Sequence, residues 1–214
     1  MNKKKLKKIW YQVPPDYYEK GIKTNSFQFI WHNWKWFSIK KILQNLNPTP
    51  TKILDIGCAS GHITTKIADF FPKAEVYGLD SYDKAIKLGK KIHPKIKFVV
   101  DNAHKLSFKN ETFDLITCIE TLEHLENPAK ALQEMERVLK NDGKLLIGQD
   151  TDNWLFRLIW FLWTKWRGKV WAGSHIHPLD AKSLEKLIQK IGFKIKTKRL
   201  SQFGLEVFFL AFRK

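Results

Sequence analysis

The chain has 214 residues, of which 43% are hydrophobic, so it can bury a sizeable core and is not globally disordered. Its formal net charge is +17, from 38 Lys and Arg against 21 Asp and Glu. This excess favours anionic partners such as nucleic acid, acidic lipid headgroups or acidic small molecules, although a lysine-rich solvated surface explains it equally well. Two cysteines, Cys58 and Cys118, cannot supply a disulfide framework or a cysteine-based metal cluster. We therefore predict no metal site.

Residues 1–50 carry a helical pattern and no strand pattern. Aromatic and aliphatic side chains recur at helical spacing from Phe27 onward, which predicts a helix over 26–46 that ends at Asn47-Pro48. The preceding segment 13–18 contains Val-Pro-Pro-Asp and predicts a rigid turn. We interpret residues 1–50 as an N-terminal helical extension or lid.

Residues 51–148 alternate between strand and helix patterns. The predicted strands cover 52–57, 74–79, 96–100, 113–119 and 144–148. The predicted helices cover 62–71, 82–92 and 128–139. Strands with helix-length connections predict an α/β fold, a doubly wound parallel sheet with helices on both faces.

The last third of the chain follows another order. An apolar aromatic helix is predicted over 154–167 and an amphipathic helix over 180–191. Two strands, 193–200 and 205–213, are separated by a short turn, which predicts an antiparallel pair. We expect a main domain over 51–214 with a basic, aromatic insertion at 149–178.

The loop after the first strand holds the most informative pattern. An apolar strand leads through Asp55 and Gly57 into a turn of small residues, and a helix follows Gly61. In doubly wound sheets such loops lie at the ligand-binding edge, where small residues let a ligand approach the backbone. A dinucleotide fingerprint would need glycine at the positions of Ala59 and His62, so NAD and FAD are disfavoured. No Gly-Lys-Ser/Thr follows, which excludes a P-loop.

Polar side chains also follow the next strands of the predicted sheet. Asp80 ends the second strand and can accept hydrogen bonds from a ribose diol. Asp101-Asn102-Ala103 follows the third strand, and Glu120 follows the fourth. Carboxyl ends of parallel strands meet at one edge, so we expect these residues to surround one ligand.

These motifs resemble the cofactor site of class I S-adenosylmethionine-dependent methyltransferases of the small-molecule type. The order of the motifs, together with Phe113-Asp114-Leu115-Ile116 and Glu123-His124-Leu125, resembles the methyltransferases of ubiquinone and menaquinone biosynthesis. The resemblance implies a Rossmann-like, seven-stranded sheet whose last strand is antiparallel, and S-adenosylmethionine as the cofactor. It implies these cofactor-binding residues: Asp55, Gly57, Cys58, Ala59, Gly61, Asp80, Asp101, Asn102, Ala103 and Glu120. Ala59 departs from the family's glycine, and we expect the alanine to be tolerated through a negative φ.

Methyl transfer from a sulfonium is an in-line displacement, which needs a general base only if the acceptor must lose a proton. His124 and His175 are the candidate catalytic bases, with His177 and Glu120 as further candidates. Each histidine could instead pack or make a structural hydrogen bond. Cys58 and Cys118 are expected to pack rather than react.

The acceptor must be recognised outside the cofactor core, by residues 1–50 and 149–178. Because the segment 154–171 is apolar, rich in tryptophan and cationic, it is interpreted as a buried lid or as a contact with an anionic membrane. We predict a small-molecule acceptor, lipid-like or isoprenoid in character. An RNA methyltransferase and a non-catalytic cofactor-binding protein are the alternatives, and nucleic acid is disfavoured because no RNA-binding module is visible.

The sequence also bears on localisation. Basic residues at 3–8 are followed by no apolar segment, so we expect no signal peptide. No apolar run approaches the roughly 20 residues that a spanning helix needs. The expected location is the cytoplasm, with peripheral attachment to the membrane as an extension of that expectation.

Overall fold

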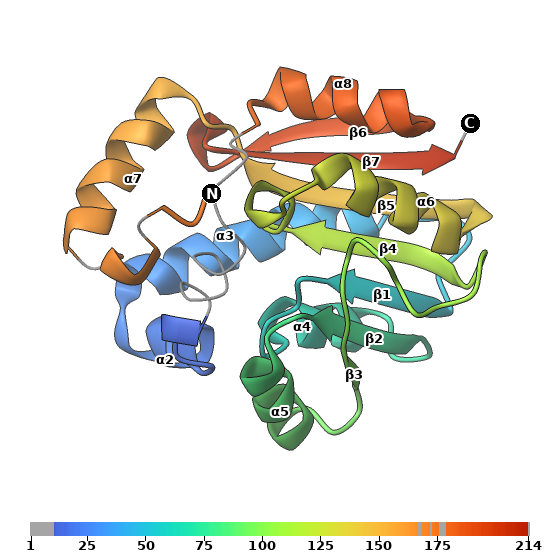
Figure 1. Ribbon diagram of the computed structural model, residues 1–214, viewed down its shortest axis with the longest axis horizontal. Coiled ribbons are helices and arrows are strands. Elements are labelled where there is room, and N and C mark those ends of the chain that lie inside the picture. Colours follow the sequence, from blue (N-terminus) through green and yellow to red (C-terminus); the bar gives the residue numbers. More distant parts are fainter. Residues whose placement is uncertain (1–10, 167, 172, 176–178, 214) are drawn as a thin grey trace.

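The computed structural model describes residues 11–166, 168–171, 173–175 and 179–213. Within them, seven strands form one sheet in the order β3-β2-β1-β4-β5-β7-β6 (Figure 1). The strands are β1 (Lys52–Ile56), β2 (Glu75–Asp80), β3 (Lys97–Val100), β4 (Phe113–Ile119), β5 (Leu139–Asp150), β6 (Phe193–Ser201) and β7 (Glu206–Arg213). Neighbours among β1 to β5 pair in parallel, whereas β7 is antiparallel to both β5 and β6. The predicted doubly wound sheet with an antiparallel last strand is confirmed.

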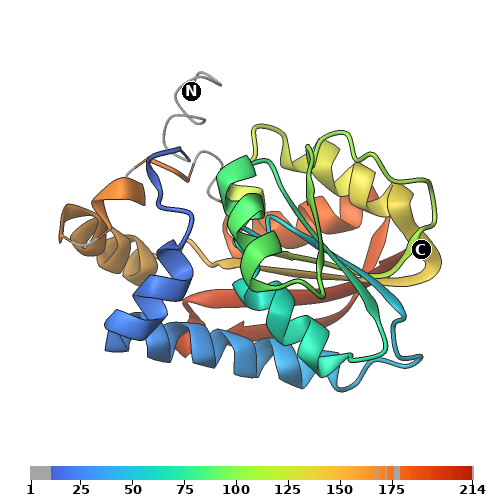
Figure 2. The ribbon, with the colours of Figure 1, turned by 90° about the horizontal axis from the view of Figure 1, so that it is seen from below.

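Helices cover both faces of this sheet. The helices are α2 (Tyr17–Thr24), α3 (Ser26–Leu43), α4 (His62–Phe70), α5 (Asp83–Ile92), α6 (Pro128–Val138), α7 (Trp154–Trp166) and α8 (Ala181–Ile191). Seen from below, α3 and α4 lie on one side of the sheet, and α6 and α8 lie on the other (Figure 2). Helices α2 and α7 lie beyond one end of the strands, where β1 and β4 finish (Figure 1).

Two clusters of buried apolar side chains hold these layers together. On one face, Leu132 and Met135 of α6 and Ile188 of α8 pack against the sheet. On the other face, Ile39 and Leu43 of α3 pack against β1, β4 and β7. The second half of α3 is therefore part of the core, although it lies in the segment expected to be an N-terminal extension.

Two local predictions were wrong. The segment expected to be a turn runs into the helix α2, in which Tyr17 and Tyr18 form the first turn. Strand β5 begins at Leu139 and not at the predicted residue 144, so Asn141-Asp142-Gly143 lies within the strand. The pairing of β4 with β5 shifts register between Phe113 and Leu115, and this irregularity accommodates the extra residues.

The strand order reverses between β1 and β4, because β2 and β3 extend the sheet from one side of β1 and β5 extends it from the other. Crevices at the carboxyl ends of strands flanking such a switch point are the usual ligand sites of open α/β sheets. The loops that follow β1, β2, β3 and β4 all begin at this carboxyl edge of the sheet. Among the described residues, no helix has the length and apolar character required to cross a membrane.

Candidate active site

The loop after β1 turns sharply at three residues. Gly57 has φ +78°, Ala59 has φ +48° and Gly61, which precedes α4, has φ +99°. The expectation of a negative φ at Ala59 was wrong, since alanine here adopts the left-handed region at a cost of about 1–2 kcal/mol. A Cβ on Gly57 would lie 2.1 Å from Oγ1 of Thr121, so this position requires glycine.

Asp55 lies beneath this loop with both carboxylate oxygens occupied. The hydroxyls of Thr64 and Thr117 each donate to one oxygen, both at 2.6 Å. Burial raises the pKa of Asp55 to about 6, although the two hydroxyl bonds act in the opposite direction. Asp55 thereby ties β1 to α4 and β4 and supports the loop from below.

The larger cavity, of about 460 Å³, opens at the ends of β1, β2, β3 and β4. Seven of the ten predicted cofactor-binding residues line it, namely Gly57, Ala59, Asp80, Asp101, Asn102, Ala103 and Glu120. The other three lie elsewhere: Cys58 packs against Ile86 and Phe98, Asp55 and Cys58 line a small adjoining cavity, and Gly61 faces the Phe98 ring.

Asp80 and Asp101 are held in place by backbone donors. The backbone amides of Ala59 and Tyr82 donate to the two oxygens of Asp80, both at 2.9 Å. Burial raises the pKa of Asp80, and these backbone bonds counteract it. Asp101 accepts hydrogen bonds from the backbone amide and the hydroxyl of Ser107. Both side chains are thus oriented at the wall of the cavity before any ligand binds.

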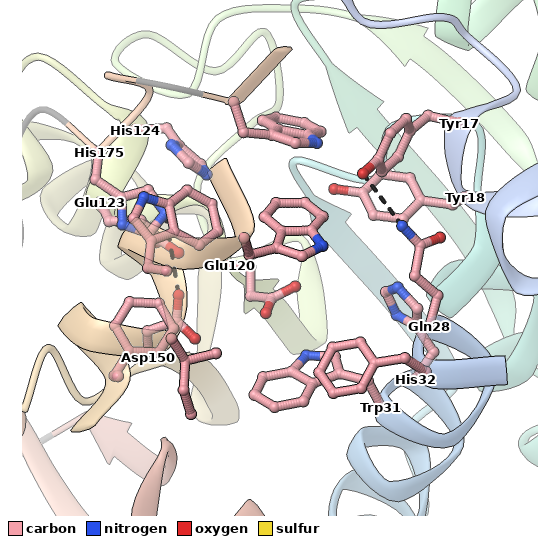
Figure 3. A pocket seen from close by; sticks show the side chains of 16 residues that line it. Tyr17, Tyr18, Gln28, Trp31, His32, Glu120, Glu123, His124, Asp150 and His175 are labelled. Carbon is pink, nitrogen blue, oxygen red and sulfur yellow. Dashed lines mark hydrogen bonds and ion pairs between the residues drawn. The ribbon is translucent and has the colours of Figure 1, made fainter. Parts of the chain in front are cut away.

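A second, smaller pocket of about 120 Å³ adjoins the first (Figure 3). Its walls come from α2, α3, α7 and the ends of β4 and β5, and they are mostly aromatic. The two pockets share four lining residues: Tyr18, Glu120, His124 and Trp171. A ligand in one pocket therefore lies next to a ligand in the other.

The two predicted catalytic histidines lie together in the smaller pocket (Figure 3). Their ring centres are 5.0 Å apart. Nδ1 of His124 lies 3.0 Å from the carbonyl oxygen of Ser174, which can only accept, so Nδ1 carries the proton and Nε2 is an acceptor. Burial lowers the pKa of His124 to about 4 and also lowers the pKa of His175. Both rings are therefore neutral at pH 7. The further candidate His177 lies outside the described residues.

Glu120, proposed both as a cofactor ligand and as a base, is paired with a residue that the sequence analysis missed. Lys35 of α3 is 1% exposed, forms an ion pair with Glu120, and lies 3.0 Å from a carboxyl oxygen of Glu206 at the start of β7. Burial opposes the ionisation of Glu120, but Lys35 outweighs it and holds the pKa at about 2. Glu120 is therefore ionised at neutral pH and is too weak a base to take a proton.

Further carboxyl groups surround this pair. Burial raises the pKa of Glu206 to about 8 although Lys35 lies beside it, and burial raises the pKa of Asp150 well above its usual range.

The sequence did contain a signal for Lys35. With His32, Ile39 and Ile42 it occupies the stripe of α3 that faces the protein.

Helix α7 has two apolar faces. Phe156, Ile159, Trp160 and Trp163 line the smaller pocket, whereas the outer face exposes Leu158, Phe161, Leu162 and Trp166. The two alternatives of a buried lid and a surface contact therefore describe opposite faces of one helix. The positive charge is partly balanced, because Arg157 pairs with Asp152 at 2.7 Å.

Replacing Lys35 with methionine should leave Glu120, whose side chain is 25% exposed, without its partner and lower the free energy of unfolding by about 1–3 kcal/mol at pH 7. The stability that the depressed pKa of Glu120 contributes is fully present above the unfolded-state pKa of about 4.5 and is lost as the pH falls toward the folded-state pKa of about 2. The difference between the two proteins should therefore shrink as the pH falls toward 3. Urea unfolding across this range measures it.

Two variants control this experiment. Lys35→Met/Glu120→Gln should recover much of the loss, because the orphaned charge is gone. Lys40→Met, at an exposed position of the same helix, should unfold like the wild type. A loss below about 1 kcal/mol in Lys35→Met, or one independent of pH, would show that the ion pair is not formed.

Known proteins share this fold and these motifs. A family model described as a methyltransferase domain matches residues 31–198. A demethylmenaquinone methyltransferase of Thermotoga maritima is 32% identical over 102 residues, which cover 48% of this chain and 44% of that protein. The chain thus spans less than half the length of that relative.

Solved structures agree over most of the chain. A Pyrococcus horikoshii protein superposes with a TM-score of 0.73 at 20% identity, covering 96% of this chain and 98% of that one. The magnesium protoporphyrin IX methyltransferase of Synechocystis, solved with bound S-adenosylhomocysteine, has a TM-score of 0.70 at 17% identity, with 89% of each chain covered. Through its family match and its fold, this chain belongs to the S-adenosylmethionine-dependent methyltransferase family.

Proposed function

We propose that the protein transfers a methyl group from S-adenosylmethionine to a small-molecule acceptor with an apolar body. The observation that supports this most directly is the pair of adjoining pockets, one at the switch point of the sheet and one walled by aromatic rings. With the cofactor in the larger cavity and an acceptor in the smaller pocket, the methyl group and the acceptor would lie on either side of the lining that the two pockets share. Aromatic walls exclude water and fit an apolar ligand.

The larger cavity suits the family's cofactor. Its volume lies in the range of small-molecule sites, and the loop at Gly57 leaves no room for a side chain. Asp80 would accept from the ribose hydroxyls, and Asp101 or Asn102 would face the adenine. The bound cofactor supplies an electrophilic methyl group. His124, neutral and with Nε2 as an acceptor, is placed to take a proton from the acceptor.

We further propose that the apolar outer surface docks on a lipid bilayer containing anionic lipid. Helix α3 exposes an apolar stripe at helical spacing, formed by Phe27, Ile30, Trp34 and Phe37. Helix α7 exposes the apolar outer face described above. Phe203 is 84% exposed and contacts Trp34 at a centroid distance of 5.1 Å.

Cations accompany these exposed rings. Lys41 Nζ lies 4.5 Å from the centre of the Phe37 ring, and Lys165 Nζ lies 4.4 Å from that of Phe161. Apolar rings beside lysines complement acyl chains beside anionic headgroups. The same two helices wall the aromatic pocket, so an acceptor could enter it from the bilayer.

Asp80→Ala should weaken S-adenosylmethionine binding by about 1.5–3 kcal/mol, as for hydrogen bonds lost to a charged group. Isothermal titration calorimetry measures the binding, with NAD as a ligand that should not bind. Asp142→Ala, at an exposed position outside the cavity, is the matched control. Unchanged affinity in folded Asp80→Ala protein would remove Asp80 from the site.

Trp163→Ala should raise the KM for the acceptor at least fivefold and leave cofactor affinity unchanged, because Trp163 lines only the smaller pocket. Metabolite and lipid extracts with methyl-labelled cofactor, followed by mass spectrometry, identify the product to be assayed. Trp36→Ala on α3, outside the pockets described above, should behave like the wild type. The absence of any labelled product would contradict the proposed activity.

Phe161→Ser/Leu162→Ser should reduce sedimentation with vesicles of phosphatidylcholine and phosphatidylglycerol, and high salt should weaken wild-type binding. Trp160 and Trp163 of the same helix line the smaller pocket and stay unchanged in this variant. The control Ile92→Ser/Val100→Ser removes exposed apolar side chains elsewhere. Wild-type protein that ignores anionic vesicles would refute the docking.

A further inference from the structure

The smaller pocket carries acidic groups that its own lining does not neutralise. Glu120, Glu123 and Asp150 line it, and among the described residues its lining includes no lysine or arginine (Figure 3). Lys35 lies behind the wall, pairs with Glu120 and lies beside Glu206. This is unexpected in a chain with a formal net charge of +17, and it marks the pocket as a site for positive charge.

Glu123 is the group most in need of a partner. It is 2% exposed, and neither of its carboxyl oxygens has a hydrogen-bond partner among the described residues. A buried polar group without a partner is costly and points to a missing ligand. Burial raises the pKa of Glu123 to about 8, and the charge on Glu120 adds to this effect. In the unliganded protein Glu123 is therefore mostly protonated at pH 7.

The histidines of the pocket do not compensate for these carboxyl groups. Burial lowers the pKa of His32 to about 3 and that of His124 to about 4. His175 also has a lowered pKa from burial, and Nε2 of its ring is 4.0 Å from Asp150. At neutral pH all three rings are uncharged, so no described side chain in the lining supplies positive charge, and a cationic ligand would supply it.

The walls of the pocket suit an organic cation. They include the rings of Tyr17, Tyr18, Trp31, Trp160, Trp163 and Trp171. The Trp160 ring stacks on His175 at a centroid distance of 4.3 Å, and Trp171 meets Tyr17 edge to face at 5.4 Å. Aromatic faces around a carboxylate bind ammonium groups through cation–π attraction while they contact an apolar body.

We propose that the acceptor is an organic amine, whose nitrogen is bound by Glu123 inside this aromatic cage and is the atom that receives the methyl group. This inference rests on the proposed methyl transfer and names its substrate class. A divalent metal is the competing occupant, because ligand atoms of Glu123, His124 and His175 lie within 4.8 Å of one another. The aromatic walls favour the amine, since Mg²⁺ or Ca²⁺ would need further oxygen ligands or waters there.

The proton balance fits methyl transfer to nitrogen. An amine and Glu123 share one proton, as ammonium with carboxylate or as free amine with carboxylic acid. In the second form the nitrogen lone pair forms a bond to the methyl carbon while the carbon–sulfur bond breaks, and the bonding electrons return to sulfur as a neutral thioether. Glu123 keeps the proton that it received from the substrate, and the new ammonium nitrogen gives one proton to Nε2 of His124, from which it passes to solvent.

The test compares amines with alcohols of the same shape. Calorimetry at pH 7.5 with S-adenosylhomocysteine present should show 2-phenylethylamine or butylamine binding at least tenfold more tightly than 2-phenylethanol or butanol. Glu123→Gln should lose this preference, and Glu185→Gln on the surface should keep it. Trp160→Leu should weaken amine binding severalfold, whereas Trp160→Phe should retain most of it.

The outcomes separate the two proposals. No preference for either amine over its alcohol, or a preference that survives Glu123→Gln, would overturn the amine site. Amine binding that requires added Zn²⁺ or is abolished by EDTA would also overturn it in favour of a metal. If methyl label reaches other acceptors while the protein binds amines no more tightly than alcohols, the methyltransferase proposal stands and the amine site is refuted. A preference for amines over alcohols without any transfer of methyl label would instead contradict the proposed methyltransferase activity. The amine-binding site would then stand without that activity.

Discussion

A single buried lysine faces more carboxyl groups than it can neutralise, and much of the site depends on this imbalance. Lys35 brings together α3, the end of β4 at Glu120 and the start of β7 at Glu206. Its ammonium holds Glu120 ionised, while Glu206 keeps its proton at neutral pH. Helix α3 is thereby joined electrostatically to strand ends at the edge of the sheet where the larger cavity opens.

Polar contacts reinforce this junction from both sides. The hydroxyls of Ser38 on α3 and Ser201 on β6 are 2.6 Å apart, and the side-chain amide of Gln202 donates to the carbonyl of Trp31. Glu120 itself has φ +49°, a strained conformation that the surrounding contacts must maintain. Binding geometry at the boundary of the two pockets is therefore set by packing that is complete before any ligand arrives.

The sequence was sufficient to predict those features of the fold that depend on local patterns of residues. The alternation of apolar runs and turn residues was enough for the sheet, and β4 was predicted at its observed bounds, Phe113–Ile119. Seven of the predicted cofactor-binding residues line one cavity, because parallel strands place their carboxyl ends at one edge of the sheet. Ala59 was misjudged because φ is set by the closure of the turn, which a side-chain type does not reveal.

Other features depended on tertiary contacts that sequence alone does not specify. The aromatic pocket combines α2, α3 and α7 with the ends of β4 and β5, segments more than a hundred residues apart. Helix α2 was missed because it is only eight residues long and follows two prolines. The charge imbalance could not be foreseen either, because Glu123 and Asp150 resemble surface acids until the fold buries them.

The central claim is that Glu123 is protonated in the unliganded pocket and that a bound ammonium group replaces this proton. Calorimetry of 2-phenylethylamine binding in buffers of different ionisation enthalpy counts the protons exchanged. An alkylammonium has a pKa of about 10, and Glu123 has a pKa of about 8, so binding should release about one proton at pH 7. At pH 9 the release should approach zero. No release at pH 7, or the same release from Glu123→Gln, would contradict the claim.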